Sequence, residues 1–174
     1  FLTDSNPPFL SNFVRMNETK RRIALLGSPG SIGTQALDVI REQKDHFEVE
    51  VLTSNSNADL LIRQAIEFQP NAVVIADESR YSQVKESLSK YPVKVFAGAD
   101  ALEQVVESDG IDMVLTALVG YAGLRPTLSA IRSGKHIALA NKETLVVAGE
   151  LVTGMAKENS VNIYPVDSEH SAIF

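Results

Sequence analysis

A loop of closely spaced glycines is the first feature of this sequence that could do chemistry. Gly27, Gly30 and Gly33 lie between a short apolar run and an amphipathic stretch, as expected where a strand meets a helix. At such a junction the backbone N–H groups and the helix dipole point toward a bound anion, and a pyrophosphate is the natural ligand. We expect Gly27 and Gly30 to allow a tight turn and close backbone approach, and Gly33 to let the helix lie against the strand.

The glycine spacing separates two kinds of nucleotide site. G-x-x-G-x-x-G is a variant of the dinucleotide fingerprint G-x-G-x-x-G. A nucleoside-triphosphate P-loop needs Lys-Ser/Thr after its last glycine, and Gly33 is followed by Thr34-Gln35, which excludes that site. A glycine-rich turn that binds nothing is the structural alternative. The position of the loop on the first βα turn favours cofactor binding.

The end of the second predicted strand indicates the type of cofactor. An NAD-preferring site places an acidic residue about 20 positions after the glycines, where it accepts hydrogen bonds from the ribose hydroxyls. Here that place reads Thr53-Ser54-Asn55-Ser56-Asn57, without a carboxylate. Because neutral side chains tolerate a 2′-phosphate, we predict NADPH over NADH. The alternative is a polar turn that caps the next helix at Asp59.

A second polar cluster, Asn141-Lys142-Glu143, directly follows the apolar run 137–140 and opens a helix. Lys142 supplies a compact positive charge that can hold a substrate oxygen or a developing oxyanion, with Asn141 and Glu143 bonding the cofactor. The alternative is a helix start in which Asn141 is the cap and Glu143 favours the helix dipole.

A third cluster, Asp167-Ser168-Glu169-His170, follows the last predicted strand. Residues two apart in extended chain point the same way, so Asp167 and Glu169 can converge on one cation. Two carboxylates without cysteine suit Mg²⁺ or Mn²⁺. A solvated strand end or helix cap is the alternative. His46 and His136 have no such neighbours and are expected to be structural.

Short apolar runs that alternate with amphipathic stretches surround these clusters. The pattern is typical of βαβ units, and it predicts an α/β fold: a doubly wound, Rossmann-like parallel sheet with helices on both faces. Strands are predicted at 23–26, 48–53, 72–76, 93–96, 113–117, 136–140 and 161–166. Helices are predicted near 32–40, 58–68 (stopped by Pro70), 81–88, 102–106, 126–133 and 142–158. Ligands of such sheets bind beyond the carboxyl ends of the strands, where all three clusters begin.

Composition and charge exclude several classes of protein. The 174 residues are 44% hydrophobic and include no cysteine, which indicates a globular chain without disulfides, thiol catalysis or a cysteine-ligated metal. A net charge of −6 and the lack of a long basic run argue against a nucleic-acid partner. No apolar run approaches the roughly 20 residues that cross a bilayer, so we expect no membrane partner and a soluble, cytoplasmic protein. Residues 1–15 are expected to be non-native or upstream sequence, with Met16 as the biological start.

Four segments of the sequence closely resemble the 1-deoxy-D-xylulose 5-phosphate reductoisomerase family, NADPH- and metal-dependent enzymes of non-mevalonate isoprenoid synthesis. The resemblance spans 23–174 and rests on GSPGSIGTQALDVI from Gly27, LVGYAGLRPTLSAI from Leu118, ALANKETLV from Ala138 and PVDSEHSAIF from Pro165. It implies rearrangement of the ketose phosphate and then reduction of the resulting aldehyde by NADPH, giving 2-C-methyl-D-erythritol 4-phosphate. A cation that holds the neighbouring oxygens can polarise the carbonyl in such a reaction.

The resemblance also implies roles for individual residues. The cofactor phosphates would lie on the loop of Gly27, Pro29, Gly30, Ser31 and Ile32, and the adenosine phosphate near Asn55, Ser56 and Asn57. Asn141 and Glu143 would bind NADPH, while Lys142 and Ser168 would bind the sugar phosphate. Asp167 and Glu169 would ligate the metal, and Glu169 would also touch substrate. Lys142, Glu169 and His170 are the predicted catalytic residues.

The chain departs from the family pattern in sequence and in length. Pro29 stands where the family commonly has Thr, which removes a hydroxyl and one backbone N–H. Asn55-Ser56 replaces a Gly-Lys pair of some members, which lowers the positive charge near the 2′-phosphate. The chain stops at Phe174, so we expect a fold truncated before the catalytic and C-terminal helical domains. Residues 16–150 would form the NADPH-binding domain and 151–174 the beginning of the catalytic domain.

The truncation leads us to expect NADPH binding without turnover by this polypeptide, and the resemblance implies a homodimer for the full-length protein. Two other functions are compatible with the first domain. One is a different NAD(P)-dependent oxidoreductase, for example one acting on aspartate-pathway intermediates, against which the Asp-Ser-Glu-His motif argues. The other is a non-catalytic nucleotide-sensing or assembly module, which has no need of a metal ion.

Overall fold

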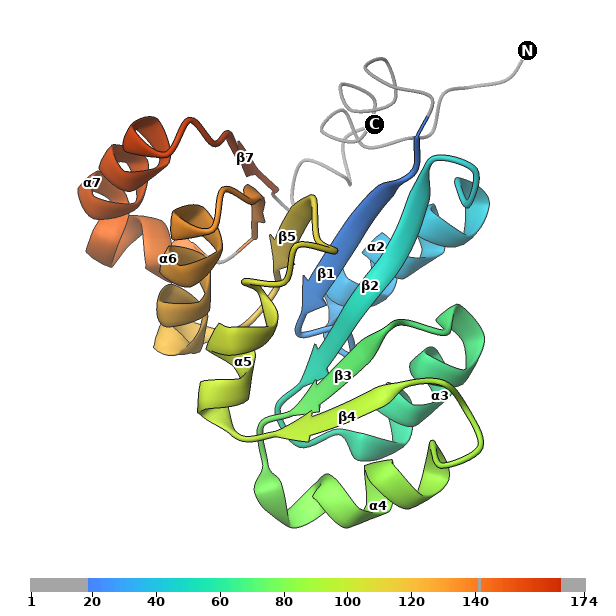
Figure 1. Ribbon diagram of the computed structural model, residues 1–174. Coiled ribbons are helices and arrows are strands. Elements are labelled where there is room, and N and C mark those ends of the chain that lie inside the picture. The colour runs from blue at the N-terminus through green and yellow to red at the C-terminus, as the bar shows by residue number, and fades with distance from the viewer. Residues whose placement is uncertain (1–18, 141, 167–174) are drawn as a thin grey trace.

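Seven parallel strands form one sheet in the order β4-β3-β2-β1-β5-β6-β7 (Figure 1). The computed structural model describes residues 19–140 and 142–166, leaving out the side chain of Lys142. The chain enters the sheet at its centre, builds outward through β2 to β4, then returns to the other side of β1. This order confirms the predicted α/β, Rossmann-like fold.

The elements alternate between strand and helix along almost the whole described chain. The strands are β1 (Arg21–Leu26), β2 (Phe47–Ser54), β3 (Ala72–Ile75), β4 (Lys94–Ala97), β5 (Met113–Thr116), β6 (His136–Leu139) and β7 (Ile163–Pro165). The helices are α2 (Ser31–Glu42), α3 (Ala58–Phe68), α4 (Tyr81–Ser87), α5 (Ala99–Val105), α6 (Leu124–Arg132) and α7 (Lys142–Glu158), with 3₁₀ turns at Glu78–Arg80 and Gly120–Gly123.

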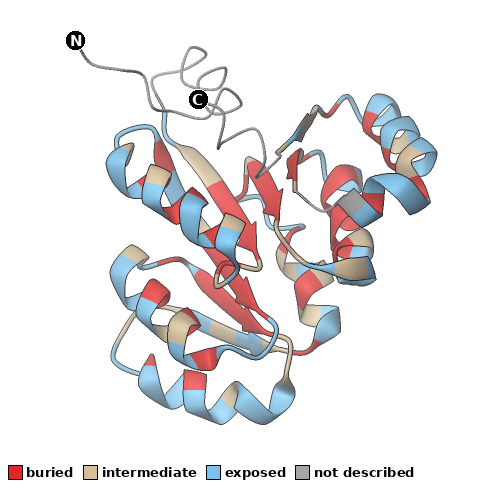
Figure 2. Ribbon diagram, turned by 180° about the vertical axis from the view of Figure 1, so that it is seen from behind, coloured by how far each residue is buried: buried red, intermediate tan, exposed pale blue. Residues whose placement is uncertain are grey.

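The strands carry apolar side chains on both faces, as a sheet covered on both sides requires. On β1, Ile23 and Leu25 pack in the cluster beneath α2, α3 and α4, while Ala24 and Leu26 pack in the cluster beneath α5, α6 and α7. Figure 2 shows the buried residues gathered in the strands and on the sheet-facing sides of the helices. Ile32, the first residue of the helix predicted near 32–40, is half-buried because it lies in the first turn, at the rim of its cluster.

Proline lies at one end of each of two helices. α3 ends at Phe68, and Gln69 adopts a left-handed conformation before Pro70, the predicted stop. α6 begins at Leu124, two residues before the predicted start, because Pro126 sits in the first turn, where its missing N–H costs no helical hydrogen bond.

Helix α7 contains a break. The backbone at Ala148 leaves the helical conformation (φ −131°, ψ 20°), so two helical segments meet there. The predicted domain boundary between residues 150 and 151 falls within this helix, and β7 lies in the same sheet as β1. A second domain beginning at 151 stays a prediction.

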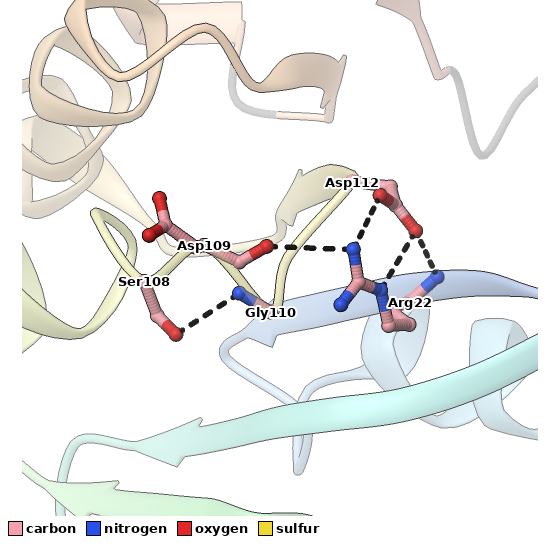
Figure 3. A network of polar contacts seen from close by, with 5 residues as sticks. All are labelled: Arg22, Ser108, Asp109, Gly110 and Asp112. Atoms are coloured by element: carbon pink, nitrogen blue, oxygen red, sulfur yellow. Dashed lines mark hydrogen bonds and ion pairs between the residues drawn. The ribbon is translucent and has the colours of Figure 1, made fainter.

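An ionic network holds the amino ends of β1 and β5 together (Figure 3). The Arg22 side chain donates from Nη2 to Asp112 Oδ1 (3.0 Å) and from Nε to Oδ2 (3.2 Å), and its backbone N–H also donates to Oδ2 (2.9 Å). Arg22 Nη2 reaches the Asp109 carbonyl at 3.4 Å. Burial alone raises the pKa of Asp112, but the hydrogen bonds from Arg22 outweigh it and the net pKa is lowered.

Candidate functional site

The segments that continue β1, β2 and β6 begin side by side at the carboxyl edge of the sheet. Leu26 of β1 pairs with Thr53 of β2 and with Thr116 of β5, and Thr116 pairs with Leu139 of β6. The residues after these strand ends therefore meet, as predicted for a doubly wound sheet. This edge is opposite to the end that carries Arg22 and Asp112 (Figures 1 and 3).

The glycine turn, residues 27–33, needs two of its glycines for steric reasons. Gly27 has a φ of +86°, and a Cβ there would lie 2.9 Å from the Ala117 carbonyl oxygen. A Cβ on Gly33 would overlap the Gly27 carbonyl oxygen, so α2 packs against the turn itself. Gly30 differs: it has a φ of −69°, it is exposed, and the nearest atom to a Cβ would be 3.4 Å away. The fold tolerates a side chain there, so close approach of a ligand is what would require glycine.

The turn presents the start of α2 to solvent. The Gly30 N–H donates to the Gly27 carbonyl (3.1 Å), which closes the turn around the half-buried Pro29. Gly30 is the N-cap residue and has no side chain to accept a hydrogen bond, and within the described helix no acidic residue occupies the first turn. Ser31 is exposed and Ile32 half-buried. The first N–H groups of a helix lack intrahelical partners, so this end suits an anion.

Helix α3, which starts at the same edge, is capped by its own chain. The Asn57 side chain accepts from the Leu60 N–H at 3.1 Å, and Asp59 lies in the first turn. The alternative for this polar turn, a helix cap, is therefore confirmed, but the cap residue is Asn57; Asp59 accepts a hydrogen bond from Gln83 instead (2.7 Å). Of the two helix starts, that of α2 is left open for a ligand.

The loop after β2 is exposed at all three predicted positions, Asn55, Ser56 and Asn57. A carboxylate follows the neighbouring strand β3: the Asp77 N–H donates to the Asn55 carbonyl at 2.8 Å. The Asp77 carboxylate accepts from the Ser79 hydroxyl (2.6 Å) and N–H (3.0 Å), which lowers its pKa. The Asp77 carboxylate thus caps the 3₁₀ turn Glu78–Arg80.

Two residues of the Asn-Lys-Glu cluster, Lys142 and Glu143, lie at the start of α7, as predicted. Lys142 is the first residue of the helix and Glu143 is exposed in its first turn. Asn141 and the Lys142 side chain lie outside the described residues. Thr144, which follows, is buried.

The predicted metal motif continues from β7. The Val166 N–H donates to the Leu139 carbonyl at 2.8 Å, which holds the end of β7 against β6. The motif itself lies outside the described residues, so its side chains are not placed: Asp167, Ser168, Glu169 and His170. Within 19–140 and 142–166, no group of three His, Asp or Glu side chains could hold a metal ion. His136 accepts from the Asn162 N–H (3.1 Å) at the amino end of β6, which fits its expected structural role.

A buried polar network that the sequence reading missed anchors the glycine turn. Thr53 accepts from the Gly27 N–H at its hydroxyl (3.1 Å) and from the Ser28 N–H at its carbonyl (2.9 Å). The Ser28 hydroxyl donates to Gln64 Oε1 at 2.7 Å, and Gln64 Nε2 donates back to the Ser28 carbonyl at 3.1 Å. A glutamine on the apolar stripe of α3, between Leu61 and Ala65, is the sequence signal that could have revealed it.

Apolar side chains are exposed beside the candidate site. Val119 and Tyr121 lie in the segment after β5, and Val146, Val147 and Leu151 lie on α7. The two elements are neighbours, since α7 contacts the 3₁₀ turn Gly120–Gly123. No helix in the described part of the chain is long and apolar enough to cross a membrane.

Known proteins are similar to this chain in both sequence and fold. The family model described as 1-deoxy-D-xylulose 5-phosphate reductoisomerase matches residues 23–149. The enzyme of that name from Phocaeicola vulgatus is 64% identical over 155 residues, which are 89% of this chain and 41% of the relative. A structure of the reductoisomerase from Zymomonas mobilis in complex with NADPH has 43% identity and a TM-score of 0.83, covering 87% of this chain and 40% of that one.

A structure of DOX-P reductoisomerase in complex with NADPH, fosmidomycin and magnesium has 37% identity and a TM-score of 0.81, over 86% of this chain and 37% of the other. The chain thus spans about two fifths of the length of the relatives that it matches. The match over most of the described sheet shows that the chain belongs to the 1-deoxy-D-xylulose 5-phosphate reductoisomerase family.

Proposed function

We propose that this chain contributes the NADPH-binding part of a reductoisomerase. The complete reaction would convert 1-deoxy-D-xylulose 5-phosphate to 2-C-methyl-D-erythritol 4-phosphate with NADPH and Mg²⁺ or Mn²⁺. The observation that carries this proposal is the glycine turn, whose exposed Gly30 opens the N-terminus of α2 at the carboxyl edge in a chain of this family. Family membership supports this function over a different oxidoreductase or a sensing module.

The glycine turn fits a cofactor pyrophosphate. The N–H groups of the first turn of α2 face outward from an N-cap without a side chain, and the positive end of the helix dipole adds to the attraction. Gly30, Ser31 and Ile32 would hold the phosphates. The fixed turn of Gly27 and Pro29 would set their height above the sheet.

Two observations support NADPH over NADH. The exposed loop of Asn55, Ser56 and Asn57 presents neutral groups, which do not repel a 2′-phosphate. The similar structure from Zymomonas mobilis is a complex with NADPH.

The remaining predicted residues would complete the site around substrate and metal. When bound, NADPH supplies hydride. Asn141 and Glu143 would orient the cofactor, and Lys142 would hold a substrate oxygen at the start of α7. Ser168 would bind the sugar phosphate, Asp167 and Glu169 the cation, and His170 would lie beside the substrate.

We propose that this 174-residue chain binds NADPH. We also propose that residues 16–150 form the cofactor domain, that residues 151–174 begin the catalytic domain, and that the full-length protein is a cytoplasmic homodimer.

Calorimetric titration with NADPH and, separately, NADH tests the cofactor part of this proposal. We expect saturable binding of NADPH and weaker binding of NADH; equal affinities would overturn the cofactor preference. An assay for oxidation of NADPH that depends on 1-deoxy-D-xylulose 5-phosphate tests the rest. Turnover by the 174-residue chain would contradict the expectation that it is inactive alone.

A further inference from the structure

Gln64 is a polar residue among the apolar side chains of the core. It lies on α3 with only 6% of its surface exposed, and its helical neighbours Leu61 and Ala65 belong to the core cluster beneath α2, α3 and α4. A buried side-chain amide is costly unless both its donor and its acceptor find partners. Both of the partners that Gln64 finds are on Ser28.

The two hydrogen bonds run in opposite directions between Gln64 and Ser28. The Ser28 hydroxyl donates to Oε1 at 2.7 Å, and Nε2 donates to the Ser28 carbonyl at 3.1 Å. Ser28 is fully buried, so these bonds form away from water, where their loss is expensive. The pair joins α3 to the second residue of the glycine turn.

The carbonyl that Gln64 holds belongs to an unusual peptide unit. The next residue is Pro29, so the Ser28–Pro29 peptide has a carbonyl oxygen and no N–H. If that oxygen turned toward the start of α2, it would place a negative partial charge among the N–H groups that attract an anion. Gln64 Nε2 keeps the oxygen directed into the core instead.

We propose that Gln64 is a positioning residue for the cofactor pyrophosphate. It acts through Ser28 by fixing the orientation of the Ser28–Pro29 peptide, and it does not touch the cofactor. This inference rests on the proposed binding of NADPH at the glycine turn. It assigns a function to a residue on α3 that lies outside the three polar clusters.

Two substitutions separate the donor from the acceptor. Gln64→Met has similar volume and removes both hydrogen bonds. Gln64→Glu keeps an acceptor for the Ser28 hydroxyl but loses the donor to the Ser28 carbonyl and puts like charge against it. Because the carbonyl is what must be held, both variants are expected to weaken NADPH binding by about tenfold or more, as loss of a buried hydrogen bond would.

A matched control separates positioning from simple loss of stability. Val84→Ala leaves a small cavity in α4, away from the glycine turn, and lowers the melting temperature without changing the loop. It is expected to bind NADPH as the wild type does at temperatures well below its melting point.

The measurements are Kd values for NADPH and for adenosine 2′-monophosphate, which lacks the pyrophosphate, together with the melting temperature of each variant without ligand. We expect the Gln64 variants to lose affinity for NADPH while affinity for adenosine 2′-monophosphate changes less than twofold. Unchanged NADPH affinity in both folded variants, or equal losses for the two ligands, would overturn the proposal. If the wild-type chain does not bind NADPH, the proposed function itself is overturned. This outcome is distinguishable from failure of the Gln64 proposal, because it is seen without any substitution.

Discussion

The two ends of the sheet are held by different kinds of polar contact. At the amino end, Arg22 and Asp112 form a partly exposed ion pair, with 42% and 29% of their side-chain surfaces accessible. At the carboxyl end, Ser28, Thr53 and Gln64 form a buried network of neutral groups. Exposed charges are hydrated in the unfolded and folded states alike, whereas buried neutral groups lose water and must be paired. Polar groups must therefore be paired more strictly at the carboxyl end, where the cofactor is proposed to bind.

The largest effect is expected from crowding the carboxyl end. In Gly33→Ala, the new Cβ overlaps the Gly27 carbonyl, so the turn and α2 must separate. We expect a loss of about 2–3 kcal/mol in the free energy of unfolding, measured by urea denaturation, since overpacking against backbone cannot relax easily.

The control for that variant is Gly154→Ala on the exposed side of α7, where a Cβ would meet nothing within 4 Å. It should raise stability by about 0.5–1 kcal/mol, because alanine favours a helix interior more than glycine does. Equal stability of Gly33→Ala and the wild type would contradict the steric account of the turn.

A second substitution separates folding from binding at the same turn. Gly30→Ala has room for its Cβ, so the melting temperature should stay within a degree or two of that of the wild type. NADPH affinity should fall by about tenfold, because the side chain stands where the pyrophosphate approaches the backbone. Unchanged affinity in a calorimetric titration would remove the argument that Gly30 serves the ligand.

The stability contributed by the amino end of the sheet should depend on pH, and substitutions there should leave NADPH affinity unchanged. Asp112 has a lowered pKa in the folded protein, so it stabilises the fold above the pKa of about 3.9 that it has when unfolded. This stabilisation is lost as pH falls through the lower folded pKa. Asp112→Asn should therefore be less stable than the wild type at pH 7, the difference should shrink as pH falls below about 3.9, and NADPH affinity should be unchanged.

Urea denaturation at several pH values measures this difference. A constant gap between Asp112→Asn and the wild type from pH 7 to pH 2.5 would show that the ionised carboxylate is not what stabilises the pair.

The smallest effect is expected from His136, at the same end. Burial, followed by the charge of Arg21, lowers its pKa, while Asp112 opposes the shift. As pH falls below about 6.5, the unfolded chain takes up a proton that the folded protein still refuses, so stability decreases through that range. His136→Asn keeps an acceptor for the Asn162 N–H and removes the titration.

The melting temperature of His136→Asn should fall less between pH 7 and pH 5 than that of the wild type. Parallel curves would mean that His136 has the same proton affinity in both states.

The sheet could be predicted from sequence because its determinants are local. Apolar runs such as 23–26 and 113–117 need only neighbouring residues to be recognised as strands, and Pro70 stops α3 by its own chemistry. Which residue caps α3 could not be decided from the sequence, because Asn57 and Asp59 are equally good caps by residue type. The path of the chain out of β2 decides between them.

The glycine turn shows what local reading cannot supply. The sequence predicts one role for Gly27 and Gly30, yet Gly27 is required by a carbonyl at Ala117 and Gly30 by no part of the fold. Gln64 escaped notice because its partner, Ser28, lies 36 residues earlier. Contacts of this kind follow from the packing of α3 onto β2 and β3, which no pattern within one element encodes.

The central place of β1 also sets an order for folding during synthesis. The units that build β1 to β4 pair in the order in which they leave the ribosome, so this half of the sheet can assemble early. The other edge of β1 must wait for β5, since Arg22 and Asp112 are 90 residues apart. Until then an apolar strand edge stays open, and a slow stretch of translation between residues 98 and 112 would prolong its exposure to other nascent chains.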